Sequence, residues 1–275
     1  MTLSRFARLS ARLADPASLA LQLRSSAYAL SSSPAAAAVP ALAAAARTSP
    51  LREVRALAVF CLGQSVSDDV LCVEPAIEAM VNDESGFVRA TAAAALGFAG
   101  RRLAAAGGQA RKAAVAKCVE ALASAVGRDD IANDFFGAGE GQPPFHGSAA
   151  SNEATNTVRS AVRENAAISL SMLATVAAAD SDDLGLGPAW EAAAEVLGHV
   201  LQEDLNKFVH AFAHETVRRL YAASPQAGGH FGRVWEEFEG SERWRPPHFQ
   251  IACEFLSDPS EFLFVEGGRG KNQMS

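Results

Sequence analysis

The residues with the clearest potential for chemistry lie in one short stretch, HAFAHE, which runs from His210 to Glu215. His210 and His214 are four residues apart, so on a helix they would share one face and could bind one metal ion together. The zinc-protease patterns HExxH and HxxEH are both absent. The other interpretation is a helix face in which both histidines are structural. We therefore predict no metal and no other cofactor, and His210 and His214 stand as the only candidate ligands.

The cysteines do not provide a second candidate metal site. None of the four belongs to a CxxC pair, whereas zinc ligands usually come in close pairs. Cys61, Cys72 and Cys118 lie in apolar helical patterns, where cysteine acts as a small hydrophobic residue. We expect free thiols in a reducing compartment. Because no nucleophile elbow, phosphate loop or catalytic triad is recognisable either, the sequence favours a non-enzymatic protein over an enzyme.

The elements that position these residues are predicted to be helices. The chain has 275 residues, 49% of them hydrophobic, and alanine, the strongest helix former, is abundant. No stretch shows sustained polar/apolar alternation with β-branched residues, so the predicted class is all-α.

The net charge of −7 argues against general nucleic-acid binding. No run of 18 apolar residues predicts a transmembrane helix. One local basic cluster is interpreted as a solvated helix end and the helix after it: Arg101, Arg102, Arg111, Lys112 and Lys117.

Five segments of the chain share one pattern. They begin at Leu23, Val54, Val88, Val162 and Val209, with spacings of 31, 34, 74 and 47 residues. The fifth position is always alanine, and the second is arginine in every copy except the last, which has histidine. The first, fifth and ninth positions fall on one helical face, whose small central residue lets a neighbouring helix approach closely. A second helical stretch precedes the last four copies across a short turn, so each unit is a helix pair that must stack on its neighbours to bury its apolar face.

The stretch DESGFVRATAAAALG, which starts at Asp83, resembles a HEAT repeat, and the resemblance extends over about residues 1–223. It implies a right-handed α-solenoid of about five helix pairs. It also implies that the repeat arginines bond turn groups of their own or the adjacent pair, with Asp83 as the nearest partner for Arg89. The arginines are Arg24, Arg55, Arg89 and Arg163, and the turn aspartates are Asp83 and Asp204.

The resemblance leaves three kinds of function open. The first is a non-catalytic scaffold or adaptor that binds another protein through its concave face. The second is an enzyme or chromophore-lyase-like member of the superfamily that would use His210, His214 and Glu215. Deoxyhypusine hydroxylase, such a member, builds a two-iron site from several His-Glu pairs, whereas the repeats here contain only His214-Glu215. The third is a subunit held permanently in a larger assembly.

Composition divides the chain into further segments. The solenoid is predicted over residues 1–226, with a loop insertion at 128–156 that carries Phe135, Phe136 and Phe145. These phenylalanines either dock on a partner or pack on neighbouring helices. Residues 227–266 are predicted to form an aromatic helical cap on the open end of the solenoid, with Phe231, Trp235 and Phe238 at helical spacing. Residues 267–275 are predicted to be a disordered tail.

The first 15 residues contain three arginines and no acidic residue before Asp15. This composition is typical of an organellar transit peptide. A first solenoid helix explains the same residues, because Leu3, Phe6, Leu9 and Leu13 form a helical stripe. We expect an intracellular protein, cytoplasmic unless residues 1–15 direct it to an organelle.

Overall fold

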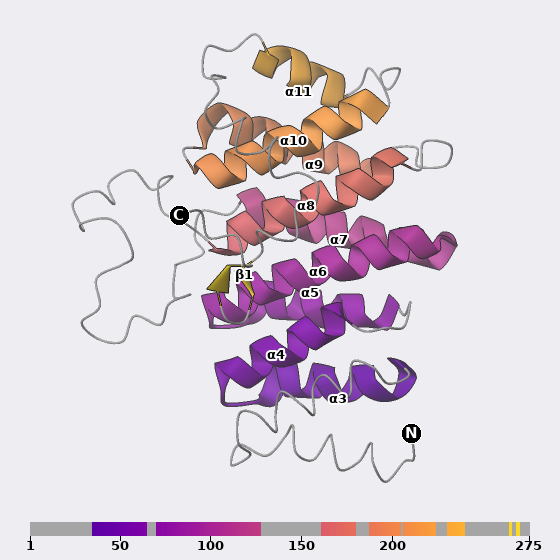
Figure 1. Ribbon diagram of the computed structural model, residues 1–275, viewed down its shortest axis with the longest axis vertical. Coiled ribbons are helices and arrows are strands. Elements are labelled where there is room, and N and C mark those ends of the chain that lie inside the picture. The colour runs from indigo at the N-terminus through magenta and orange to yellow at the C-terminus, as the bar shows by residue number, and fades with distance from the viewer. Residues whose placement is uncertain are drawn as a thin grey trace, which may run out of the picture.

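The computed structural model of the chain describes residues 35–64, 70–127, 161–179, 187–204, 206–223, 230–239, 264–265 and 268–269. The helices in these ranges stack side by side along one axis (Figure 1). They form four antiparallel pairs, which confirms the all-α solenoid. The pairs are α3 (Ala35–Thr48) with α4 (Arg52–Gly63), α5 (Val73–Asn82) with α6 (Gly86–Ala106), α7 (Gln109–Gly127) with α8 (Ala161–Ala179), and α9 (Pro188–Glu203) with α10 (Lys207–Ala223).

The pairs build two layers. The first helices, α3, α5, α7 and α9, contact one another in sequence and form what we call the outer layer. The second helices, α4, α6, α8 and α10, do the same and form the inner layer. A short 3-10 helix, η1 (Val70–Cys72), leads into α5. We call the side of the inner layer that points away from the outer layer the inner face.

The alanine stripe predicted from the repeats lies in the core between these layers. Ala58, Ala92, Ala166 and Ala213 are all 0% exposed. The valine that opens each segment and the Leu or Val at its ninth position are buried as well. The stripe is buried because it faces the outer layer, where only small side chains allow the helices to approach closely.

Small residues also set the distance between neighbouring inner helices. A Cβ atom added to Gly63 of α4 would lie only 2.5 Å from the Cα of Ala95 in α6. On the other flank of α6, the Ser169 hydroxyl donates to the Ala93 carbonyl at 2.9 Å, and the Asn165 amide donates to the Ala90 carbonyl at 2.8 Å. These bonds to a neighbouring helix backbone are possible only because glycine and alanine line the contact.

The predicted insertion does not disturb the stack. α7 packs against α8 as α5 packs against α6, although residues 128–160 separate α7 from α8 in sequence. This pairing was expected, since the free energy of closing a loop rises only slowly with its length. The insertion itself, with Phe135, Phe136 and Phe145, lies outside the described residues, as do Arg24 and the N-terminal stretch 1–34.

One more helix covers the far end of the stack. α11 (His230–Glu239) contacts α9 and α10, at the place where the composition predicts a cap. Its Trp235 stacks on Tyr221 of α10, with ring centroids 5.9 Å apart and an interplanar angle of 12°. Two short strands, β1 (Phe264–Val265) and β2 (Gly268–Arg269), pair antiparallel, and β1 contacts α6. Gly268 and Arg269, which lie within the tail predicted to be disordered, pair with Val265 and Phe264.

Candidate protein-interaction surface

A buried ion pair joins the first two helix pairs at their turns. Arg55 of α4 donates to the two carboxylate oxygens of Asp83, the residue that ends α5, at 2.8 and 3.0 Å. The two side chains are only 8% and 6% exposed. Arg55 also donates to the Ser49 carbonyl of its own turn at 3.0 Å. The hydrogen bond from Asp83 raises the pKa of Arg55 further above its ordinary value.

The same connection recurs between the last two pairs. Arg163 of α8 donates to the carboxylate of Asp204, after α9, and to the Val126 carbonyl of its own pair at 2.8 Å. Each aspartate also holds the turn that follows it, because Asp83 accepts from the Ser85 amide and Asp204 from the Asn206 amide, both at 2.8 Å. The repeat arginine thus links its own turn to the turn of the next pair, and we call these two links the arginine ladder.

Arg89 bonds carbonyl groups of the turn in its own pair, which is one of the arrangements that the resemblance implies, but it does not bond the Asp83 carboxylate. It donates to the backbone carbonyls of Asp83 and Glu84 at 2.7 and 3.0 Å, whereas the Asp83 carboxylate belongs to Arg55 of the preceding pair. Sequence distance pointed to Arg89 because the turn that precedes it is close along the chain. In the last pair, where histidine replaces the arginine, His210 donates through Nε2 to the Leu201 carbonyl at 3.2 Å.

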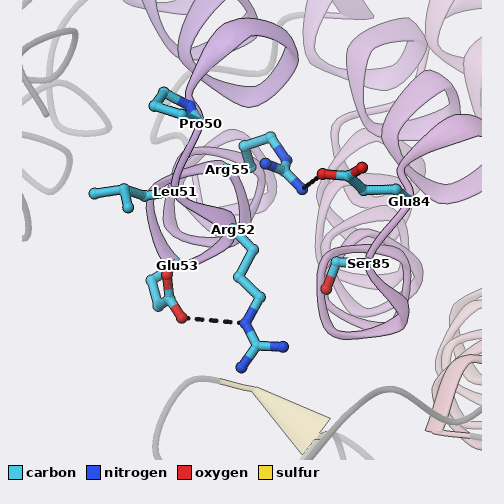
Figure 2. Close-up of a pocket in the computed structure, with 7 residues that line it drawn as sticks. All are labelled: Pro50, Leu51, Arg52, Glu53, Arg55, Glu84 and Ser85. Atoms are coloured by element: carbon cyan, nitrogen blue, oxygen red, sulfur yellow. Dashed lines mark hydrogen bonds and ion pairs between the residues drawn. The ribbon is translucent and has the colours of Figure 1, made fainter. Parts of the chain in front are cut away.

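A polar recess opens on this turn edge, between the first turns of α4 and α6. Figure 2 shows its lining residues: Pro50, Leu51, Arg52, Glu53, Arg55, Glu84 and Ser85. Each of its two cationic side chains already contacts a carboxylate, because Arg52 pairs with Glu53 at 3.1 Å and Arg55 with Glu84 at 3.1 Å. The charges of these four side chains cancel, so the recess gives no reason to expect a charged ligand.

The histidine-glutamate stretch is built into the helix packing. Glu215 is fully buried and accepts from Arg218 at 2.7 and 2.6 Å and from Arg219 at 2.6 Å. His214 is buried next to Trp235, with ring centroids 5.1 Å apart. Among the described residues, no group of three or more His, Cys, Asp and Glu side chains could hold a metal ion. Both carboxylate oxygens of Glu215 accept hydrogen bonds from Arg218 or Arg219 in ion pairs.

Burial of His214 makes the stability of the fold depend on pH. Desolvation, with smaller contributions from the charges of His210 and Arg218, lowers its pKa to about 3. Below pH 6.5 the His214 side chain binds a proton in the unfolded chain but stays neutral in the folded chain. The free energy of unfolding must therefore fall as the pH falls. We expect the free energy of unfolding to lose up to about 1.4 kcal/mol per pH unit between pH 6 and pH 4 from this group alone. The free energy of unfolding is measured by urea titration at several pH values. We expect it to change less steeply with pH in His214→Gln than in the wild type, whereas His199→Gln, at an exposed position, should keep the wild-type dependence on pH.

Three cysteines are buried in the helix packing, and two residues of the basic cluster bond groups of neighbouring helices. Cys61, Cys72 and Cys118 are buried free thiols, and burial raises the pKa of Cys118 to about 12, which makes it unreactive. Arg111 donates to the Ala106 and Gly107 carbonyls at the end of α6, at 3.3 and 3.2 Å. Lys117 pairs with Glu74 of α5, and this bond raises its pKa.

Aromatic side chains mark the inner face at the N-terminal half of the stack. Phe60 of α4 and Phe98 of α6 are half-buried and meet edge to face, with centroids 6.3 Å apart and an angle of 89°. Phe87, at the start of α6, is half-buried too, and Arg101 is exposed one turn beyond Phe98. Phe60 lies two residues after the stripe alanine of its segment, which places it about 200° around the helix and hence on the inner face. This helical offset is a signal in the sequence from which the cluster could have been identified.

Residues 39–117, from α3 into α7, match a family model described as HEAT repeats. No curated protein matches the chain. No helix in the described part of the chain is both long enough and apolar enough to cross a membrane.

Proposed function

We propose that the protein is a non-catalytic scaffold or adaptor that binds another protein, on the premise that residues 39–117 match a HEAT-repeat family model and lie within an all-α solenoid. The binding surface we assign to it is the inner face of α4 and α6, defined by Phe60, Phe87, Phe98 and Arg101. The single observation that carries the proposal is this group of half-buried aromatic residues on a rigid stack. Aromatic residues and arginine are enriched among the residues that dominate protein–protein affinity.

Rigidity supports the assignment because a surface that is already ordered loses little entropy on binding. The arginine ladder links the first pair to the second and the third pair to the fourth, and the close contacts at Gly63 and Ser169 set the distance between neighbouring inner helices. We further propose the insertion 128–156, with Phe135, Phe136 and Phe145, as a second contact for the same partner. We propose an intracellular location, where the buried thiols stay reduced.

Phe98→Ala is expected to weaken binding about 30-fold or more, which corresponds to the loss of about 2 kcal/mol at a dominant contact. The partner is first captured from native extract with the wild-type chain, then purified and titrated against each variant by calorimetry. Val81→Ala provides the matched control, because Val81 is 40% exposed but lies on α5 of the outer layer.

Equal affinities for Phe98→Ala and the wild type would remove the inner face of α6 as the binding surface. A variant that lacks residues 130–152 tests the second contact in the same titration. Stoichiometric iron or zinc in the purified protein would contradict the scaffold proposal and favour an enzyme of the same superfamily.

A further inference from the structure

Three repeat arginines occupy the same place on their helices, but they do not have the same partners. Arg55, Arg89 and Arg163 each lie three residues before the stripe alanine, so their side chains leave their helices in the same direction. Arg55 and Arg163 bond the aspartate carboxylate in the turn of the next pair. Among the residues that the structure describes, Arg89 pairs with no carboxylate, and its bonds go to the carbonyls of Asp83 and Glu84.

The sequence explains why the ladder is interrupted at this point. Asp83 and Asp204 each lie six residues before the second position of the following repeat segment, so the ladder aspartate has a fixed place in its repeat. The same place in the segment of Arg163 holds Thr157, which lies outside the described residues and whose side chain is uncharged. The next turn therefore provides no aspartate at the ladder position for Arg89.

The hydrogen bonds of Arg89 use a different side of the guanidinium from the side that binds aspartate in Arg55. In Arg55, Nη1 donates to a carbonyl of its own turn, while Nε and Nη2 donate to the two Asp83 carboxylate oxygens at 2.8 and 3.0 Å. In Arg89, Nη1 donates to both turn carbonyls, and the buried Nε has no acceptor within the described part of the chain. A buried donor normally has an acceptor, and the paired Nε and Nη2 groups match the two oxygens of a carboxylate.

The Arg89 guanidinium is within reach of a group from solution, because the residue is only half-buried and its bond to the Glu84 carbonyl is exposed. We propose that Nε and Nη2 of Arg89 form a carboxylate-binding site, and that an aspartate or glutamate side chain of the partner protein occupies it. The inference rests on the proposed scaffold function and specifies the chemistry of the partner. Its acidic side chain completes the arginine ladder between the second and third helix pairs.

Nuclear magnetic resonance of the arginine Nε–H groups tests the site in the full-length chain without any partner. The probe is N-acetylglutamate α-amide, which carries one carboxylate, and the control is N-acetylglutamine α-amide, which is uncharged. The Arg89 signal, identified by its loss in Arg89→Lys, should shift with the glutamate probe and not with the glutamine probe. Half-saturation is expected on the order of 10 mM, the strength of one or two charge-assisted hydrogen bonds. The Arg55 signal should stay in place, because Asp83 already binds its Nε.

Two results of this titration would overturn the carboxylate site of Arg89. One is an Arg89 signal that stays in place, or that moves no more than the signal of the exposed Arg101. The other is a shift that occurs only in the variant lacking residues 130–152, which would mean that the insertion fills the site in place of a partner.

Calorimetry with the purified partner tests the source of the carboxylate. Arg89→Gln should weaken binding about tenfold or more, because it removes the positive charge and the paired donors. Arg89→Lys, which keeps only the charge, should fall between Arg89→Gln and the wild type. Arg52→Gln is the matched control, since Arg52 is also half-buried on the turn edge but pairs with Glu53, and it should keep the wild-type affinity.

The two proposals fail in distinguishable ways. If Phe98→Ala weakens partner binding and Arg89→Gln does not, the proposed binding surface stands and the partner carboxylate at Arg89 is rejected. If Arg89→Gln weakens binding and Phe98→Ala does not, the carboxylate site stands and the inner face of α6 is rejected.

Discussion

Arg55→Ala is expected to destabilise the protein by about 3–5 kcal/mol, the cost of removing one partner from a buried ion pair. The substitution removes both bonds to the Asp83 carboxylate and leaves that carboxylate, 6% exposed, without its counter-charge. It also removes the bond to the Ser49 carbonyl, so two successive turns lose a shared anchor. Urea denaturation followed by circular dichroism measures the loss directly.

Two other arginines provide a graded control for the ladder. Arg89→Ala removes bonds to two backbone carbonyls but leaves no carboxylate without its counter-charge. We therefore expect the free energy of unfolding to fall by a smaller amount, about 1–3 kcal/mol. Arg101 is exposed, and Arg101→Ala should stay within about 0.5 kcal/mol of the wild type. If Arg55→Ala costs no more than Arg101→Ala, the ladder does not hold the pairs together.

Gly63→Ala is expected to cost about 3 kcal/mol, at the upper end of what overpacking costs. The new Cβ would lie 2.5 Å from the Cα, 2.7 Å from the Cβ and 2.9 Å from the carbonyl oxygen of Ala95. Because backbone atoms cannot turn aside as a flexible side chain can, α4 and α6 must move apart. This penalty outweighs any gain in helix propensity at Gly63, the last residue of α4, because that gain is at most about 1 kcal/mol even in a helix interior.

Gly232→Ala is the matched control, since Gly232 also lies inside a helix. The nearest atom to its added Cβ is the Cε2 of Tyr221 at 4.0 Å, which is ordinary van der Waals contact. Only the helix propensity changes there, so Gly232→Ala should be neutral or stabilising by up to about 1 kcal/mol. If both variants gain stability in thermal and urea denaturation, the close approach of α4 and α6 is not a constraint.

The repeating unit could be predicted from local residue patterns alone. Each segment has alanine at its fifth position and, in most copies, aliphatic residues at its first and ninth positions. This spacing specifies a helix that buries one face, because the helical period is a local property of the chain. Ala92 and its equivalents lie in the core as that pattern predicts. The sequence also indicated that α7 and α8 would pair across the insertion, since a helical stretch precedes the repeat copy at Val162 as one precedes the other copies, and closing a long loop costs little.

Which groups meet between units depends on how the helix pairs stack, and local patterns do not give this. The Asp83 carboxylate bonds Arg55, 28 residues earlier, because the stacking of pairs brings one turn beside the next, whereas sequence distance favoured Arg89. The surroundings of His214 were settled in the same way, since Trp235 reaches it only once α11 has packed on α10. The ion pairs of Glu215 with Arg218 and Arg219 are local by contrast, because these residues are three and four places apart on α10. A local period fixes the direction of a side chain relative to its own helix, but its partner is fixed by the path of the whole chain.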